Sequence, residues 1–256
     1  MKKLMIAASV AFMATVGFSL ESANVVGYSE VGLRSGYVAQ GSCFLPVSGD
    51  KIDLNQITVV GYNKEDGSED EVNIQLLDSR GAMVTGSNYY WIDIVDGEDV
   101  YYGWMNGEGE IIEDGVATFS AGEALWIAAP SEDYKFMYSG QVDNLGTAVT
   151  LRDGYKLVAN PTPVTVDLNS VIVKGYNIED GSEDEVNIQS LDYRGVMVTG
   201  SNYYWIDVID GEDVYYGWMD GEGEIIEDGT KILNPGEALW VNAPAANYTI
   251  EFPKAL

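Results

Sequence analysis

The chain of 256 residues contains no histidine and only one cysteine, Cys43. Without histidine it cannot build a Ser-His-Asp triad, a Cys-His pair or a His-ligated metal centre. A single cysteine cannot form an internal disulfide, and Cys43 lies far from the N-terminal context of a lipoprotein. We expect Cys43 to be a small, buried thiol.

The chain also lacks the nucleophile motif G-x-S-x-G. A pair of carboxylates of the glycosidase type is compatible with the composition, and Asp93 and Asp207 are the least implausible acid-base residues. Most of the acidic residues cluster in turns, however, rather than in a catalytic motif. We therefore expect a protein that is not an enzyme.

Long apolar runs are absent beyond the N-terminus. Lys2 and Lys3 precede an almost uncharged run over residues 4–20, which Glu21 ends. This order is typical of a secretory signal peptide, which is removed on export. We predict a signal-peptide helix over residues 1–23, with cleavage between residues 19 and 23. The mature protein is then expected to be secreted or at the cell surface, the periplasm included, without a membrane span.

One long segment occurs twice in the chain. Residues 61–115 return as residues 175–229 with an offset of 114 and seven mismatches. Further upstream Gly36 matches Gly154 with an offset of 118, so the first copy has four extra residues around residues 43–51. A repeat this close predicts two tandem modules of ordinary domain size, residues 24–140 and residues 141–256.

Short strand patterns separated by turns rich in glycine and acid fill the repeated segment. No helical period of useful length follows the predicted signal peptide. We therefore predict an all-β protein in which each module is a β-sandwich or a barrel-like meander of hairpins. The expected strands of the first copy are residues 57–62, 72–77, 89–95, 100–105, 110–113, 116–119 and 124–128.

Aromatic residues dominate two of these strands. Alternation places residues 90, 92 and 94 on one face and residues 89, 91, 93 and 95 on the other. Asp93, between two isoleucines, is then expected at a sheet edge, on a solvated face or beside a partner. A four-residue turn would place strand 100–105 beside strand 89–95.

The aromatic residues allow two interpretations. Alternate rings can fill the core of a module that is poor in leucine. Rings that point outward, beside Asp and Asn, can instead form a shallow platform for a sugar. The candidate ligand-binding residues are Tyr89, Trp91, Tyr101 and Trp104, with Tyr203, Trp205, Tyr215 and Trp218 in the second copy.

Three short motifs resemble a group of secreted bacterial proteins. They are Ala23 to Tyr28, Leu151 to Tyr155 followed by Ala159-Asn160-Pro161, and the pair Gly122 to Ile127 and Gly236 to Val241. Proteins of that group begin with an ANVVGY-like segment after the signal, close with G-E-x-[LF]-W-[IV] and have no assigned activity. The resemblance implies export and an all-β module, and it supplies no catalytic residues. The first copy departs from it, with Gly41-Ser42-Cys43 in place of the Ala-Asn-Pro turn.

The formal net charge of −28 lies almost entirely in the repeated segments. Residues 61–115 contain fourteen acidic and two basic residues, and residues 175–229 contain fifteen and one, which gives −12 and −14. Such a field repels nucleic acid and attracts cations or basic surfaces. It is also what keeps many extracellular proteins soluble.

The acidic turns are candidate calcium sites. Several carboxylates packed into a few residues repel one another until a cation is present, and Ca²⁺ prefers six to eight oxygen ligands. The spacing does not match an EF-hand loop, and solvated turn charge is the alternative. The candidate ligands are Asp66, Glu69, Asp70, Asp96 and Asp99, with Asp180, Glu183, Asp184, Asp210 and Asp213 in the second copy.

Together these features predict a secreted, non-catalytic structural or binding protein of the cell surface or extracellular matrix. One alternative is a calcium-dependent carbohydrate-binding protein, and another is a self-assembling coat or fibre subunit that uses exposed sheet edges. No cofactor is required, and Ca²⁺ is the candidate ion. The candidate partners are extracellular polysaccharide, other envelope proteins and further copies of the chain, and nucleic acid is excluded.

The calcium hypothesis predicts a higher melting temperature for the mature protein in millimolar Ca²⁺ than in EDTA. A ligand that binds only the folded state must raise the midpoint of unfolding. The measurement is a pair of thermal melts of the same sample, before and after Ca²⁺ is added. An unchanged midpoint would discard the hypothesis.

Overall fold

The computed structural model of the protein describes residues 26–47, 49–61, 72–78, 82–96, 99–175, 186–192, 196–210 and 213–255. The described chain is all-β, as predicted, with several antiparallel sheets and two 3-10 helices, η1 (Leu54–Gln56) and η2 (Leu168–Ser170). None of its helices is long and apolar enough to cross a membrane. The predicted signal peptide, residues 1–23, lies outside the described residues.

The first half of the described chain, residues 26–141, forms three sheets. Their strand orders are β2-β9-β5-β6-β7, β1-β10-β4 and β3-β8. The strands are β1 (Val26–Gly32), β2 (Gly36–Gly41), β3 (Ile52–Asp53), β4 (Ile57–Val60), β5 (Asn73–Leu77), β6 (Met83–Asp96), β7 (Asp99–Met105), β8 (Thr118–Phe119), β9 (Ala124–Ala129) and β10 (Lys135–Gln141).

The second half, residues 148–255, forms three sheets with the same orders, β12-β19-β15-β16-β17, β11-β20-β14 and β13-β18. The strands are β11 (Ala148–Thr150), β12 (Gly154–Ala159), β13 (Val166–Asp167), β14 (Ile172–Lys174), β15 (Asn187–Leu191), β16 (Met197–Asp210), β17 (Asp213–Met219), β18 (Ile232–Leu233), β19 (Ala238–Ala243) and β20 (Thr249–Glu251). Each sheet of the described chain draws its strands from one half only.

Each half buries one face of its five-stranded sheet against its three-stranded sheet. In the first half Trp104 and Ile127 of the large sheet share a buried cluster with Phe136 of β10. The rings of Trp104 and Phe136 meet edge to face, with centroids 6.0 Å apart, a favoured geometry for aromatic pairs. The second half has a matching cluster that includes Trp218 and Ile250.

The predicted pairing of the two aromatic strands is confirmed, because Trp91 of β6 lies opposite Trp104 of β7. The predicted meander holds only for β5, β6 and β7, since β9 lies between β2 and β5. The predicted strand 110–113 is wrong, and only Ile111 forms a bridge, to Met105. The reason is a turn in which the side chain of Asn106 accepts hydrogen bonds from the backbone N–H groups of residues 108 and 110.

An aspartate caps the N-terminus of the 3-10 helix in each half. Asp53 precedes η1, and its side chain accepts hydrogen bonds from the backbone N–H groups of Asn55, at 2.9 Å, and Gly115. Asp167 makes the equivalent contacts with Asn169, at 3.0 Å, and Gly229, at 2.5 Å. These carboxylates occupy the usual role of a helix N-cap and therefore have a structural explanation.

The two halves meet at a joint that is built from equivalent residues. The backbone N–H of Gly41 donates to the carbonyl oxygen of Gly236, and the N–H of Ala159 donates to that of Gly122, both at 2.9 Å. Gly41 and Ala159 are repeat equivalents, and so are Gly122 and Gly236. Each half thus offers the other the same surface, which is the pattern of an isologous, approximately two-fold contact.

Four alanines and one leucine, all buried, fill the centre of the joint. The joint cluster consists of Ala39, Ala124, Leu157, Ala159 and Ala238. Alanine and glycine let the two sheets approach closely, because larger side chains would separate the backbones. Trp126 and Trp240 are partly buried against this cluster, one from each half.

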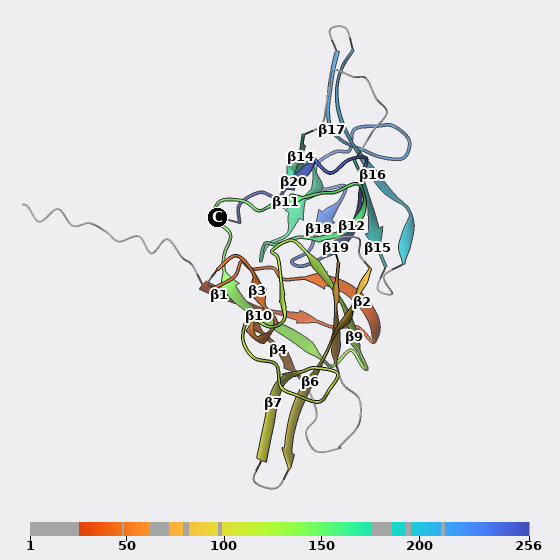
Figure 1. Ribbon diagram of the computed structural model, residues 1–256. Helices are drawn as coiled ribbons and strands as arrows, with labels where there is room; N and C mark the ends of the chain where they lie inside the picture. The colour runs from red at the N-terminus through yellow and green to blue at the C-terminus, as the bar shows by residue number, and fades with distance from the viewer. Residues whose placement is uncertain are drawn as a thin grey trace, which may run out of the picture.

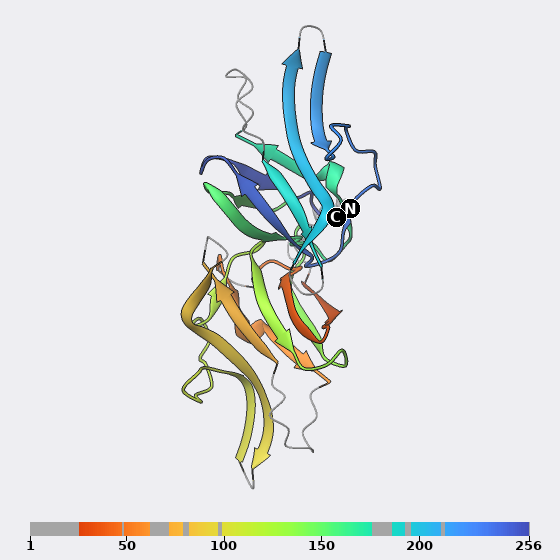
Figure 2. The ribbon, with the colours of Figure 1, turned by 90° about the vertical axis from the view of Figure 1, so that its right-hand side faces the viewer.

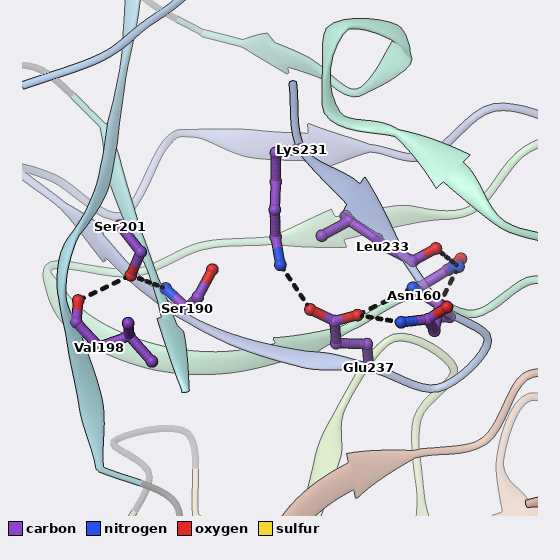
Figure 3. A network of polar contacts seen from close by, with 8 residues as sticks. Asn160, Ser190, Val198, Ser201, Lys231, Leu233 and Glu237 are labelled. Carbon is purple, nitrogen blue, oxygen red and sulfur yellow. Dashed lines mark hydrogen bonds and ion pairs between the residues drawn. The ribbon is translucent and has the colours of Figure 1, made fainter. Parts of the chain in front are cut away.

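A polar network supports the second-half side of the joint (Figure 3). The carboxylate of Glu237 accepts hydrogen bonds from the backbone and side-chain N–H groups of Asn234, both at 2.9 Å. It also forms an ion pair with Lys231, at 2.6 Å. The side chain of Asn160, which is fully buried, donates to the carbonyl oxygens of Leu233 and Asn234. Asn160 belongs to the Ala-Asn-Pro turn, so this turn anchors the loop that reaches across to Gly41.

The two long hairpins project from opposite ends of the molecule. In Figures 1 and 2 the hairpin of β6 and β7 points away from the hairpin of β16 and β17, with the joint between the two halves. This arrangement follows from the approximate two-fold contact, which turns one half over relative to the other. The described part of the protein is therefore elongated.

The joint predicts that Gly41→Ala destabilises the protein by about 1–3 kcal/mol, because overpacked sites force the backbone to move. A Cβ at Gly41 would lie 2.4 Å from the Cβ of Ala159 and 2.7 Å from the carbonyl oxygen of Glu123. Thermal or urea unfolding measures the change. The matched control is Gly32→Ala at the end of β1, where a Cβ would meet nothing within 4 Å. Equal stability of the two variants would contradict the described joint.

Candidate functional site

The four tryptophans predicted to bind a ligand lie in the core. Trp91, Trp104, Trp205 and Trp218 are at most 2% exposed. The indole N–H groups of Trp104 and Trp218 donate to the carbonyl oxygens of Ile57 and Val171, both at 2.8 Å. A surface ligand cannot reach these rings, so this part of the platform prediction is wrong. The core-filling interpretation applies to them.

The four tyrosines of the same prediction have different positions. Tyr89 is buried, with 8% exposure, and Tyr203 is partly exposed. The side chains of Tyr101 and Tyr215 lie outside the described residues. Asp93 follows Trp91 on the inward face and is 7% exposed, so of its three expected positions, a sheet edge, a solvated face or a place beside a partner, the solvated face is wrong. Its equivalent Asp207 is partly exposed.

The candidate calcium ligands fall largely outside what the structure describes. The backbones of Asp96 and Asp99 pair across the end of one hairpin, and those of Asp210 and Asp213 pair across the other. The side chains of these four residues are not described, and neither are Asp66, Glu69, Asp70, Asp180, Glu183 and Asp184. Within the described residues, no three acidic or cysteine side chains gather closely enough to hold a metal ion. The calcium site stays a prediction.

The outward side of each five-stranded sheet carries a second set of aromatic residues. We call the side of the β2-β9-β5-β6-β7 sheet that points away from the core the first outer face. One row across its strands is Tyr37, Ala128, Asn73, Tyr90 and Met105, and the next is Ala39, Trp126, Gln75 and Asn88.

The second outer face, on the β12-β19-β15-β16-β17 sheet, has nearly the same two rows. The first is Tyr155, Asn242, Asn187, Tyr204 and Met219, and the second is Leu157, Trp240, Gln189 and Asn202. Ala39 and Leu157 are buried in the joint cluster. The remaining members are partly or fully exposed, and Tyr37 and Tyr155 are the most open, at 58% and 45%.

No member of either row carries a charge, although the chain has 41 acidic residues. On each outer face two tyrosines and one tryptophan are interspersed with amide side chains. The charged residues that do lie within strands, such as Glu30 in β1, Asp93 in β6 and Lys156 in β12, are not members of these rows, so the two rows are a neutral part of a strongly acidic protein. This separation of charge from aromatic surface occurs in both halves.

Part of the amide set is held in place by local contacts. The side-chain N–H of Gln75 donates to Ser87 at 2.8 Å and to the carbonyl oxygen of Val84 at 2.9 Å. Asn88 donates to the hydroxyl of Tyr90. Within the described residues the side chains of Asn73 and Asn187 make no hydrogen bond, so their donors and acceptors are available to a ligand.

An arrangement of this kind suits a flat, polar ligand with apolar patches. Aromatic rings offer area for the C–H faces of a sugar ring, and Asn and Gln offer both donors and acceptors to hydroxyl groups. A sheet face is shallow, so many weak contacts along an extended ligand would have to replace one deep pocket. The chemistry available is binding by stacking and hydrogen bonding.

The outer faces could have been found from the sequence by carrying the alternation to neighbouring strands. Tyr90 stands on the outward face of strand 89–95, opposite to Trp91. Trp126 alternates with the apolar residues Leu125 and Ile127, which marks it as the outward residue of its strand. The missed signal was therefore the alternation in strands 72–77 and 124–128, which carry fewer aromatic residues.

Cys43 fulfils the expectation of a buried thiol. It is fully buried, and burial raises the pKa of its thiol to about 11. The thiol therefore stays protonated at neutral pH, whereas thiolate is the reactive form. The hydroxyl of the buried Tyr138 also has a pKa well above its usual value, first through burial and then through the nearby Cys43.

Comparisons with known proteins assign no family to this arrangement of sheets and outer faces. Searches with the chain found no matching protein-family model, no matching curated protein and no matching solved structure.

Proposed function

We propose that the chain is an exported, non-catalytic binding protein that holds a neutral carbohydrate polymer on its two outer faces. The observation that carries this proposal is the uncharged set of tyrosine, tryptophan and amide residues, present on the same strands of both halves. Such a set on a protein of charge −28 needs an explanation other than solubility, because charged residues serve solubility better.

We expect the aromatic rings to stack against the ligand and the amide side chains to form hydrogen bonds with it. Tyr37 and Trp126 on the first face, with Tyr155 and Trp240 on the second, would stack against sugar rings. Asn73 and Asn187 stand in the centres of their sheets and would bind hydroxyl groups of the same ligand.

The charge of the protein selects among carbohydrates. An anionic polysaccharide would be repelled by a protein of formal net charge −28, whose field reaches about 8 Å at physiological ionic strength. A neutral polymer meets no such penalty. The proposal therefore names uncharged glycans as ligands, in the extracellular surroundings to which the predicted signal peptide would deliver the protein.

Two faces on one chain would strengthen the binding of a polymer. When one face is bound, the second meets further sugar units at a high effective concentration. The backbone hydrogen bonds at the joint, at 2.9 Å, support a fixed relation between the faces. Weak contacts on each shallow face are then sufficient for useful retention on a polysaccharide.

We predict that the double variant Tyr37→Ala/Tyr155→Ala loses roughly tenfold or more in affinity for neutral polysaccharide, because a stacking ring is removed from each face and avidity is lost. Affinity electrophoresis measures this for the mature protein in gels that contain xylan, mannan or mixed-linkage β-glucan. Alginate, an anionic polymer, is expected not to retard the wild type.

The matched control for this experiment is Tyr28→Ala on β1, because Tyr28 is 76% exposed and lies off the outer faces. Substitution of Trp126 or Trp240 would also disturb the joint, because those tryptophans pack against the joint cluster. Failure of every neutral polymer to retard the wild type would overturn the proposal. Retardation that is unchanged in the double variant would overturn the assignment of the site.

A further inference from the structure

We infer that the two outer faces accept differently substituted sugars, and that the residue at the position of Ala128 and Asn242 determines the difference. This inference rests on the proposed function and deepens it. It concerns the one exposed outer-face position at which the two halves differ in chemistry.

The other exposed positions of the two rows are identical between the halves. Tyrosine, asparagine, glutamine, tryptophan and methionine recur at each equivalent place. Ala39 and Leu157 also differ, but both are buried in the joint cluster and cannot face a ligand. Ala128 in β9 and Asn242 in β19 are both partly exposed.

Asn242 lies at the centre of the second outer face. It stands opposite Tyr155 on one side and opposite Asn187 on the other. Side chains directly opposite each other in antiparallel strands have Cβ atoms about 4.5–5.5 Å apart. Asn242 therefore places a second amide group next to that of Asn187, beside the exposed ring of Tyr155.

Two adjacent amides create a polar subsite. Each offers two N–H donors and a carbonyl acceptor, and together they match neighbouring hydroxyl groups on one sugar unit. Within the described residues no hydrogen bond involves the side chain of Asn242 or Asn187, so both amides are available. A substituent that replaces a hydroxyl hydrogen would leave these amide groups unpaired under the ligand, which is costly.

The first outer face has a methyl group where the second has the amide. Ala128 stands opposite Tyr37 and Asn73, and its small side chain leaves room between them. An O-acetyl group would find apolar contact there and would break no hydrogen bond. The first face should therefore tolerate acetylated sugars, whereas the second should prefer unsubstituted ones.

The experiment reads each face separately in the full mature chain. Tyr37→Ala weakens the first face and leaves the second for measurement, and Tyr155→Ala does the reverse. Asn242→Ala is then added to the Tyr37→Ala variant, and Ala128→Asn is added to the Tyr155→Ala variant. The probes are xylan, mannan and mixed-linkage β-glucan, each with and without O-acetyl groups, in affinity electrophoresis.

We expect the second face to bind an unsubstituted polymer roughly tenfold more tightly than its acetylated form. Asn242→Ala should abolish that preference, and Ala128→Asn should create it on the first face. Melting temperatures of the four variants check that the fold is kept. Equal preferences on the two faces, or swaps that change nothing while the tyrosine variants still weaken binding, would overturn this inference alone. Absence of binding to all probes by the wild type would overturn the proposed function itself.

Discussion

The strict alternation of side chains along the central strands is the constraint on which both the core and the outer faces depend. In β6, Trp91 points into the core and Tyr90 points away from it, and the same holds for Ile127 and Trp126 in β9. A displacement of one residue in register would bring the polar rings and amides inside and expose the apolar ones. The pairing of Trp91 with Trp104, and the burial of both, oppose such a slip.

The joint couples this constraint to the relation between the two halves. Gly41 and Ala159 can approach the opposite half because their side chains are absent or small, and each donates a backbone hydrogen bond across the contact. Backbone groups buried at such a contact need partners, and the repeat supplies them twice. The outer faces begin where this contact ends, since Trp126 and Trp240 border the joint cluster.

The sequence was sufficient to predict the class of fold and several of the pairings. Turn residues and period-two patterns indicated the all-β class and the pairing of β6 with β7. They could not reveal that β9 lies between β2 and β5, because the order of strands in a sheet depends on contacts between distant residues. Residues 110–113 show a second limit, because the side-chain hydrogen bonds of Asn106 form a turn just before them and only Ile111 makes a bridge where a strand was predicted.

The sequence predicted which residue types would form the candidate site, but not which of those residues lie on the surface. Tyrosine and tryptophan beside polar residues indicated a stacking surface, yet the tryptophans chosen for it belong to the core because burial of the largest rings contributes most to stability. The residues that remain outside are found only when the alternation of several strands is combined with their register. Asn73, for example, becomes part of a site only because Ala128 and Tyr90 lie on either side of it.

The effect of a sequence difference between the halves depends on whether the residue points into the core or out to solvent. Ile127 and Val241 point into the core and differ by one methylene, a change that costs about 1 kcal/mol and keeps the chemistry apolar. Their neighbours Ala128 and Asn242 point outward, where packing imposes no such limit, and one of them is an amide. An outer-face position, by contrast, can change what the surface binds at little cost in stability. The outer faces are therefore where two nearly identical halves can acquire different specificities.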